Sequence, residues 1–599
     1  MKQFLEALQL LSVRERRQVY LLMPGIILMA CLEDAGIAAI SPFLSLVTNP
    51  ESIETNGVLR WLYGTFNFES TQSFVVFMGL IALALMVTSN LFALFMNWLL
   101  VRFAWFRNHS LSERLLAQYL AKPYTFFLER NTSEMGKNIL AEVQQVVNGL
   151  LVPGMLTLAN IIVVLFILIF LIVLNPLRAI VVALALGSGY VIVYTLLQKR
   201  MARYGDESVQ ANKGRFQLAN EALGGVKEIK LLGRENVFLG NFAKVSKLFS
   251  RRMAMAEVMS NSPRYVLDTI AFGTILTIMI VLYTQDGGQV IPVVGVYAFA
   301  GYRLMPALQQ IYRHITKARF HTSVLATVKR DLEAMTITFP DSSERLPFLD
   351  RLELSNISFK YPTAKTPLLN NLSLTISRNA SVAFVGSTGS GKTTIVDILL
   401  GLLPPDVGEV LVDGQRLDKD NLRSWQANIG YVPQTIFLSD GTIAQNIAFG
   451  ISGEKLDMEA VVKAATIANL HDFVESLPDG YNTLVGERGV RLSGGQRQRI
   501  GIARALYHDP SVLILDEATS ALDNVTEEAV FQAIKNVMGK KTVIMIAHRI
   551  STVRECDTIF ILEKGHIVSQ GSYGELLLSS RHFQALARQA VKETASVDN

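Results

Sequence analysis

Two long uncharged apolar stretches constrain this chain more than any other feature. Residues Phe74–Val101 and Val146–Leu174 contain no Asp, Glu, Lys or Arg, and each exceeds the ~20 residues that a helix needs to cross a bilayer. A third stretch, Ala179–Gln198, is about one crossing long. Half of the 599 residues are hydrophobic, which is unusual for a soluble protein. We therefore expect membrane-spanning helices.

Three weaker apolar stretches complete a set of six predicted spans. Leu21–Val47 is interrupted by Glu33 and Asp34, and two shorter runs lie around Thr269–Tyr283 and Gln289–Tyr302. For these last two, a buried helix of a soluble core is the alternative interpretation. The predicted helices cover residues about 18–48, 73–101, 145–174, 179–200, 263–284 and 288–316.

The distribution of Lys and Arg predicts the orientation of these spans. The segment Arg102–Glu142 carries six such residues and Lys199–Arg264 carries thirteen, whereas the other connections carry at most one each. Because basic loops stay on the cytoplasmic side, both long loops and both termini are expected in the cytoplasm. Helix-favouring sequence continues past the membrane in these loops, which predicts long helical extensions.

The sequence changes character after about residue 340. Short β-branched runs ("SVAFVG", "IGYVPQ", "SVLILDE", "TVIMIAH") alternate with helical stretches, a pattern typical of an α/β domain with a largely parallel sheet. The predicted fold is an all-α six-helix transmembrane domain followed by an α/β P-loop NTPase domain. We place the domains at residues 1–325 (transmembrane), 326–350 (linker), 351–590 (nucleotide-binding) and 591–599 (tail).

A phosphate-binding loop lies between a predicted strand and a predicted helix. The sequence "GSTGSGKTT" matches the pattern G-x-x-x-x-G-K-[ST], whose glycines let backbone N–H groups surround phosphate oxygens at a helix N-terminus. Lys392 can reach the β- and γ-phosphates, and the Thr393 hydroxyl can bind Mg²⁺. The predicted nucleotide-binding residues are Gly386, Ser387, Thr388, Gly389, Ser390, Gly391, Lys392, Thr393 and Thr394.

A second motif, "SVLILDEATSALD", supplies two carboxylates. Asp516 ends an apolar strand and can hold Mg²⁺ through water, and Glu517 follows it, placed to polarise an attacking water. A DE pair after a strand is by itself usually a solvated strand end. Here the catalytic interpretation is favoured, because a phosphate-binding loop lies about 120 residues upstream.

The second half of the chain resembles the ATP-binding cassette (ABC) transporter family. The "LSGGQ" run holds Ser493, Gly494, Gly495 and Gln496, which match the family's signature loop. By the same resemblance, Tyr361 stacks on adenine, and Gln434 senses Mg²⁺ and contacts the membrane domain. Asp523 lies in the loop that joins two cassettes, and His548 contacts the γ-phosphate. The family also implies ATP and Mg²⁺ as ligands, with Thr393, Gln434 and Asp516 as metal residues and Glu517, His548 and Gln434 as catalytic ones.

The resemblance implies a half-transporter that works as a pair. In this family the signature loop serves the nucleotide held by a partner cassette, and this chain has one cassette. Because Glu517, His548 and the signature residues are all present, a closed homodimer is the simpler expectation than a heterodimer. Two segments of the long basic loops, Ala121–Gly136 and Ala219–Asn236, resemble the loop tips that dock on cassettes in exporters.

One cation in the last predicted span points to the cargo. Arg303 is expected on the order of 20 Å below the outer membrane edge, and Gln310 and His314 fall on the same helical face. An intramembrane cation faces a partner or a watery cavity. The plainer interpretation is a snorkelling arginine or an ion pair with Glu33, Asp34 or Asp268, which Arg264 also approaches. The functional one is an anion site formed by Arg303, Gln310 and His314.

The membrane half, with "LEDAGIAAISPFLSLVTNP", the external segment "ESIETNGVLRWLYGTFNFES" and "YRLMPALQQI", looks most like bacterial lipid-linked oligosaccharide flippases. That likeness implies transport of a polyprenyl-pyrophosphate-linked oligosaccharide from the cytoplasmic to the outer leaflet of the bacterial inner membrane. The alternative is a lipid exporter for a lipid A-like cargo, or a multidrug exporter. An apolar external segment with Val58 and Trp61, which can lie on a membrane surface, is compatible with a lipid cargo. The alternative is a loop packed on the chain's own spans.

Charge and cysteine content exclude other classes. The net charge of +5 is small for this length and gives no case for a nucleic-acid partner. A soluble regulatory or DNA-maintenance protein can carry the same cassette, but six predicted spans argue against that class. The two cysteines, Cys31 and Cys556, fall in different predicted domains, so they cannot form a disulfide framework or a metal cluster.

Overall fold

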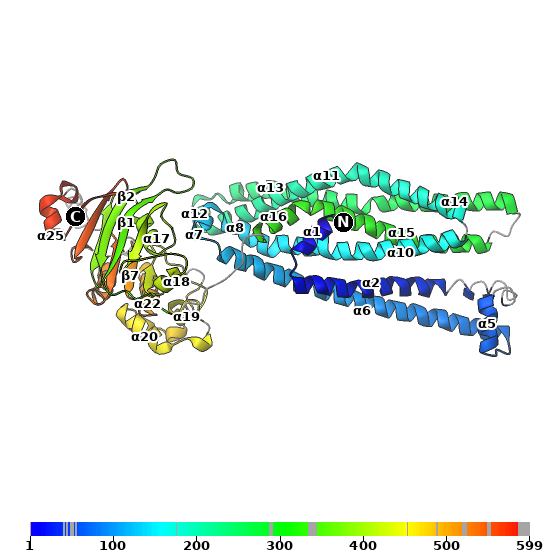
Figure 1. Cartoon of the computed structure of the whole chain (residues 1–599), viewed down its shortest axis with the longest axis horizontal. Coiled ribbons are helices and arrows are strands. Elements are labelled where there is room, and N and C mark those ends of the chain that lie inside the picture. Colours follow the sequence, from blue (N-terminus) through cyan, green and yellow to red (C-terminus); the bar gives the residue numbers. More distant parts are fainter. Residues whose placement is uncertain are drawn as a thin grey trace. The chain divides into compact units, whose positions relative to one another are not determined.

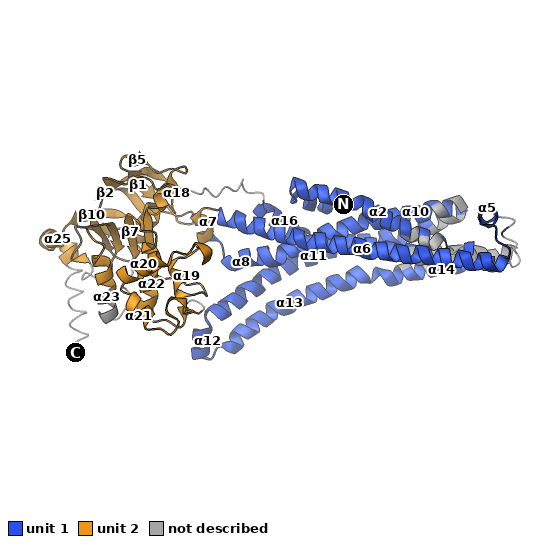
Figure 2. Cartoon of the chain, turned by 90° about the horizontal axis from the view of Figure 1, so that it is seen from below, with its two compact units in different colours: residues 1–122, 129–338 blue, residues 123–128, 339–599 orange. Residues whose placement is uncertain are grey.

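The computed structural model divides the chain into two compact units. Figure 2 shows unit 1, residues 1–122 and 129–338, and unit 2, residues 123–128 and 339–599. The structure describes residues 2–584 except 40–41, 44–45, 48–52, 54–56, 175, 287–290, 333–343, 452, 487–488, 518–523 and 548–552. The side chains of some further helical residues, among them Glu33, Asp34 and Arg303, also lie outside the described part.

Every element described in unit 1 is helical. The longest, α6 and α11, have 50 and 49 residues. The bounds are α1 Lys2–Gln9, α2 Val13–Ala38, α5 Gly57–Thr65, α6 Thr71–Leu120, α8 Thr132–Lys137, η1 Asn138–Glu142, α9 Val143–Val146, η2 Val147–Leu151, α10 Val152–Leu174, α11 Pro176–Gly224, α12 Val226–Leu232, α13 Glu235–Asn261, α14 Pro263–Asp286, α15 Ile291–Phe320 and α16 Thr322–Leu332. The elements η1 and η2 are π-helical turns.

Each predicted span overlaps one of these helices. Within the described residues, the helical runs Thr71–Leu120 and Thr132–Ile169 are long and apolar enough to cross a membrane. The expected helical extensions are present, because α6 and α11 continue unbroken from the predicted spans into the basic loops. The count of six spans and the domain limits stay predictions. The contacts divide the chain between residues 338 and 339, and α16 belongs to unit 1.

Close helix packing in unit 1 depends on two glycines. Along their lengths α2 packs on α6, α10 on α15 and α11 on α13 (Figure 1). A Cβ atom on Gly154 would lie 2.1 Å from the ring of Phe4, so the N-terminal helix α1 packs directly on the backbone of α10. A Cβ atom on Gly205 would lie 2.0 Å from the carbonyl oxygen of Phe320. The backbones of α11 and α15 are therefore in contact there.

Unit 2 contains two sheets, one of which is largely parallel as predicted. The 6-stranded sheet has the order β10-β9-β3-β8-β7-β6, and all its pairs are parallel except β9 with β10. The 4-stranded sheet, β2-β1-β4-β5, is antiparallel and was not predicted. The strands are β1 Arg351–Phe359, β2 Leu369–Ser377, β3 Ser381–Gly386, β4 Val407–Val412, β5 Gln415–Arg416, β6 Ile429–Val432, β7 Val512–Asp516, β8 Thr542–Ile546, β9 Thr558–Glu563 and β10 His566–Gly571.

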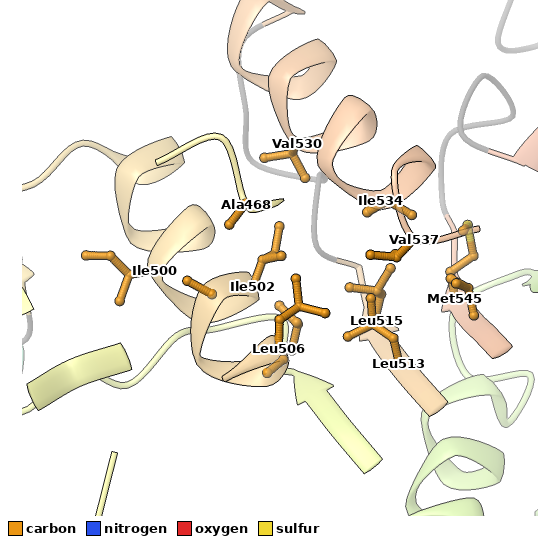
Figure 3. Packing of buried hydrophobic residues seen from close by; sticks show 14 of the residues in the cluster. Ala468, Ile500, Ile502, Leu506, Leu513, Leu515, Val530, Ile534, Val537 and Met545 are labelled. Atoms are coloured by element: carbon orange, nitrogen blue, oxygen red, sulfur yellow. The ribbon is translucent and has the colours of Figure 1, made fainter. Parts of the chain in front are cut away.

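Helices cover the parallel sheet and complete its core. The strands β7 and β8 are buried at every position, as expected of central parallel strands. Figure 3 shows Ile502 and Leu506 of one helix and Ile534 of another packed around Leu513 and Leu515. The bounds are α7 Tyr124–Glu129, α17 Lys392–Leu399, α18 Leu422–Gln426, α19 Ile443–Ile447, η3 Gly453–Lys455, α20 Met458–Ile467, α21 His471–Glu475, η4 Gly480–Asn482, α22 Gly494–Leu506, α23 Asn524–Lys535 and α25 Tyr573–Ser579.

Candidate functional site

The phosphate-binding loop connects β3 to α17 with the geometry that its sequence predicts. Gly389 and Gly391 have φ angles of 81° and 104°, a left-handed region that glycine adopts without strain. The Lys392 ammonium donates to the carbonyl oxygens of Gly386 at 2.8 Å and Ser387 at 3.1 Å. Burial lowers the pKa of Lys392, and the carboxylates of Glu517 and Asp516 oppose that shift. The loop therefore holds a cation close to the two predicted carboxylates.

Those carboxylates lie together at the carboxyl end of the parallel strand β7. Asp516 is the buried last residue of β7, and the Glu517 backbone N–H donates to the Ile546 carbonyl at the end of β8. The Gln434 amide, just beyond β6, donates to the Glu517 carboxylate at 2.7 Å. Glu517 has a φ of 48°, which is uncommon for a residue other than glycine and marks backbone strain typical of functional positions. Four predicted residues, including Lys392, thus come together.

Tyr361 lies against the helix that follows the phosphate-binding loop. Its hydroxyl is 3.0 Å from the Thr394 hydroxyl, and its ring meets Phe359 edge to face with centroids 5.0 Å apart. The Thr393 side chain is exposed. The Ser390 hydroxyl is buried and has no hydrogen-bond partner among the described residues. The loop therefore offers one exposed and one unsatisfied hydroxyl, as expected of a phosphate and cation site.

The signature residues begin a helix, a local role that the sequence reasoning missed. Ser493 is the N-cap of α22 and accepts a hydrogen bond from the Gln496 N–H, while the Gln496 side chain accepts from the Ser493 N–H. The pattern S-x-x-Q could have revealed this capping box. Gly494 and Gly495 form the first turn of the helix. Asp523 and His548 lie outside the described residues.

One further carboxylate near the site was also missed. Burial and the neighbouring Asp516 raise the pKa of Asp397, on α17, to about 6. Burial, Asp397 and Tyr361 raise the pKa of Tyr124, so this tyrosine lies near the nucleotide motifs. Tyr124 belongs to residues 123–128, which group with unit 2 although the chain on both sides belongs to unit 1. Residues 123–128 fall within the first predicted docking loop. Asp397 was missed because it belongs to no recognisable sequence motif.

The second predicted docking loop belongs wholly to unit 1. Helix α12 lies at its tip, and Gly233 ends the helix with a left-handed φ of 59°. Large apolar side chains are exposed around this tip, with Leu223 at 73%, Leu231 at 84% and Leu232 at 67%. Exposed leucines that gather at one tip indicate a contact surface.

The predicted cargo residues on α15 are only partly described. The side-chain Oε1 of Gln310 accepts a hydrogen bond from the side-chain amide of Asn160, on α10, at 3.2 Å. The Nδ1 atom of His314 is buried without a hydrogen-bond partner among the described residues. Asp268 accepts from the Gln309 amide at 2.7 Å and lies 3.6 Å from Arg264, as the alternative interpretation allowed. The Arg303 side chain lies outside the described part, so its partner stays a prediction.

Comparisons with known proteins cover both units. Residues 37–305 match the model of the ABC transporter transmembrane region, and residues 369–520 match the ABC transporter model. The chain is 32% identical to the ATP-dependent lipid A-core flippase of Cupriavidus metallidurans, over 79% of this chain and 80% of that protein. It is 34% identical to the flippase of the same name in Burkholderia pseudomallei, over 76% of each.

A solved structure agrees with these matches. The structure of a bacterial Atm1-family ABC exporter with ATP bound has a TM-score of 0.79 and 26% sequence identity to this chain. The similarity covers 97% of this chain and 99% of that one. The chain therefore belongs to the ABC transporter family, as an exporter half-transporter that binds and hydrolyses ATP to drive translocation across a membrane.

Proposed function

We propose that two copies of this chain form a flippase for a lipid whose head group carries both phosphate and sugar. The main support for this proposal is the similarity to lipid A-core flippases, which extends over both the membrane region and the cassette. The transport direction is from the cytoplasmic to the outer leaflet of a bacterial inner membrane, with the cassette and both termini in the cytoplasm. The basic loops support this orientation.

The site residues have distinct roles in hydrolysis. The phosphate-binding loop and Lys392 hold the phosphates of ATP, and Glu517, oriented by Gln434, accepts a proton from the attacking water. Thr393, Asp516 and Gln434 are the oxygen donors suited to Mg²⁺, which supplies charge neutralisation at the phosphates. The unsatisfied Ser390 hydroxyl and the left-handed glycines beside it fit a bound phosphate.

The distribution of docking segments supports the proposed homodimer. Residues 123–128 group with the cassette of their own chain, whereas the leucine-rich tip at α12 stays exposed in unit 1. The cassette of a second copy is the occupant that this tip fits. Ser493 of each chain then completes the site that contains Lys392 of the other.

Complementation between variants tests the dimer. Lys392→Ala disables one nucleotide site from its own side, and Ser493→Arg disables the partner's site. A mixture of the two single variants retains one intact site in each mixed dimer. A chain that carries both changes has none. An ATPase activity of the mixture that is no higher than that of the double variant contradicts the paired arrangement.

The external helix α5 is compatible with a second candidate cargo that has a long lipid chain, a polyprenyl-pyrophosphate-linked oligosaccharide. One side of α5 packs on an aromatic cluster, in which Tyr63 and Phe74 meet edge to face at 5.2 Å. The other side exposes Val58 at 66% and Trp61 at 65%. Such a face suits the membrane surface or a long lipid chain.

A vesicle assay separates the candidates. Purified protein in proteoliposomes is offered a lipid A-core lipid, a polyprenyl-pyrophosphate-linked oligosaccharide and a hydrophobic drug in parallel. ATP-dependent flipping of either sugar-bearing lipid by the unmodified protein, and not by Glu517→Gln, supports the proposal. Transport of the drug alone, or no transport of either lipid, overturns it.

A further inference from the structure

A cavity of about 300 Å³ lies between four helical segments of unit 1. Its walls come from α9 and η2, from Met201 of α11, from residues 253–260 of α13 and from the end of α15. These positions lie at or close to the predicted cytoplasmic ends of spans three, four, five and six. The cavity therefore lies at the expected level of the cytoplasmic leaflet's head groups. The η2 wall is π-helical, a distortion frequently found at functional sites.

The cavity wall is rich in neutral hydrogen-bonding groups. Gln144, Gln145 and Asn148 supply three side-chain amides, and Ser260 supplies a hydroxyl. Each amide presents both donors and an acceptor. Phe320 adds an aromatic side chain to the same wall. Amides combined with an aromatic ring match the alternating hydroxyl and C–H surfaces of a sugar.

His321 adds an unsatisfied polar atom to the cavity. A Cβ atom on Gly149 would lie 2.3 Å from its ring, so the imidazole packs directly on the η2 backbone. Its Nδ1 atom is buried without a hydrogen-bond partner among the described residues. A buried unpaired polar atom beside a cavity calls for a ligand or water.

The charges around the cavity balance. Burial, and secondarily Lys317, lowers the pKa of His321 to about 4, so the imidazole is neutral in the cytoplasm. Lys317 lies 3.8 Å from Glu257, and both line the cavity. These three are the titratable groups of its lining. Among the described residues that line it, the site therefore has no uncompensated cation for a phosphate, and it fits an uncharged ligand.

We propose that this cavity binds an uncharged sugar of the cargo's head group before translocation. The inference rests on the proposed function and extends it, because it assigns sugar and phosphate to different places. The volume is at the lower end of the ~300–1,000 Å³ typical of small-molecule sites, which suits an acetamido sugar rather than a whole oligosaccharide.

Paired lipids with and without sugars test the assignment. The full-length protein in nanodiscs is titrated with polyprenyl pyrophosphate bearing an N-acetylhexosamine oligosaccharide and with the same lipid lacking sugar. Lipid A-core and lipid A, which lacks the core oligosaccharide but keeps its own acylated disaccharide, form a second pair. Half-maximal ATPase stimulation gives the apparent affinity. The test variant combines Gln145→Leu with Asn148→Leu, and the control is Gln210→Leu, an exposed amide on α11 outside the cavity.

The test variant is expected to lose about tenfold in apparent affinity for the sugar-bearing lipid, because two hydrogen bonds of ordinary strength are removed. Its response to the matching lipid without the oligosaccharide and its basal ATPase should not change. The control should resemble the unmodified protein. Equal losses for both members of a pair, or no loss for either, overturn the inference while the proposed function stands. If neither sugar-bearing lipid stimulates the ATPase of the unmodified protein, both the inference and the proposed function are overturned.

Photolabelling checks the same point without a substitution. A polyprenyl-linked sugar with a photoreactive N-acyl group is expected to label peptides that contain residues 144–149, 253–260 or 317–321. Labelling confined to other peptides contradicts the sugar site, even if the leucine variant fails to fold.

Discussion

The cassette and the membrane unit organise their polar residues in different ways. In the cassette, Lys392, Gln434, Asp516 and Glu517 meet because each lies at or beyond the carboxyl end of a strand of one parallel sheet. In unit 1, polar side chains pair across helices that are far apart in the sequence. The Tyr119 hydroxyl donates to Asp331 at 2.7 Å, and the Asn138 amide donates to the same oxygen at 3.1 Å. At the strand ends, the functional residues belong to short contiguous motifs. In the long helices, the polar residues occur singly, and each pairs with a residue that is distant in the sequence.

The largest expected effect tests whether the cassette's strand ends form one catalytic unit. Glu517→Gln should retain ATP binding and lower hydrolysis by about 10²- to 10⁴-fold, because the proton acceptor is lost. Steady-state ATPase and nucleotide-binding assays measure the two properties. Asp509→Asn, an exposed carboxylate near β7 that pairs with Lys541, is the matched control and should retain hydrolysis. Near-normal turnover by Glu517→Gln would remove Glu517 from this role.

The next effect tests the buried pairs of the membrane unit. The Lys137 ammonium lies 3.1 Å from the Glu142 carboxylate, and these side chains are 2% and 1% exposed. Lys137→Met leaves a buried carboxylate unpaired and should cost about 3–5 kcal/mol of unfolding free energy. The double variant Lys137→Met/Glu142→Leu should recover much of that loss. Denaturant unfolding in detergent measures both.

An exposed pair provides the control for this comparison. Arg203 and Glu207 lie 2.8 Å apart on α11, with the arginine side chain 77% exposed. Arg203→Met should leave the unfolding free energy almost unchanged, because solvent screens the pair. If Lys137→Met destabilises the protein no more than Arg203→Met, burial does not govern the stability of these pairs.

A smaller effect concerns Arg303. If its guanidinium receives a phosphate of the cargo, Arg303→Ala should lower flipping by about ten- to a hundredfold, the equivalent of one charge-assisted hydrogen bond. The number of lipids flipped per ATP hydrolysed should fall with it. Arg303→Lys should recover only part, because lysine keeps the charge but not the planar fork. An unchanged ratio of flipping to hydrolysis would indicate a structural role instead.

The smallest effect concerns how Tyr361 is held beside the phosphate-binding loop. Thr394→Val removes the hydroxyl that pairs with the tyrosine but keeps the side-chain shape. One net hydrogen bond corresponds to a loss of about three- to tenfold in ATP affinity. Thr394→Ser should behave like the original protein. Equal ATP affinities of the valine and serine variants would show that the pair does not position the ring.

The two units also differ in how far the sequence predicts them. The phosphate-binding loop, the DE pair and the signature loop are contiguous, and each motif lies next to the strand or helix that it predicts. The left-handed backbone at Glu517 could not be predicted from the residue type, because the position has a glutamate and not a glycine. A carboxylate is required there despite the strain. The antiparallel sheet was missed because β1 and β2 show only an alternation of buried and exposed residues, with no recognisable motif beside it.

In unit 1 the apolar runs predict helices but not their partners. Asn160 and Gln310 contact each other across 150 residues of sequence, and no spacing rule connects them. The cavity at the end of α15 is a similar case, since its lining comes from four separate segments. Such sites depend on tertiary packing, which sequence periodicity does not specify.

The contact between Gly205 and Phe320 has a consequence for the width of that cavity. Met201, one helical turn before Gly205, and Phe320 itself both line it. Because the two backbones touch, the spacing between these walls is at its lower limit, and even one methyl group on residue 205 would force them apart. A residue outside the cavity therefore determines how much room a ligand finds inside it.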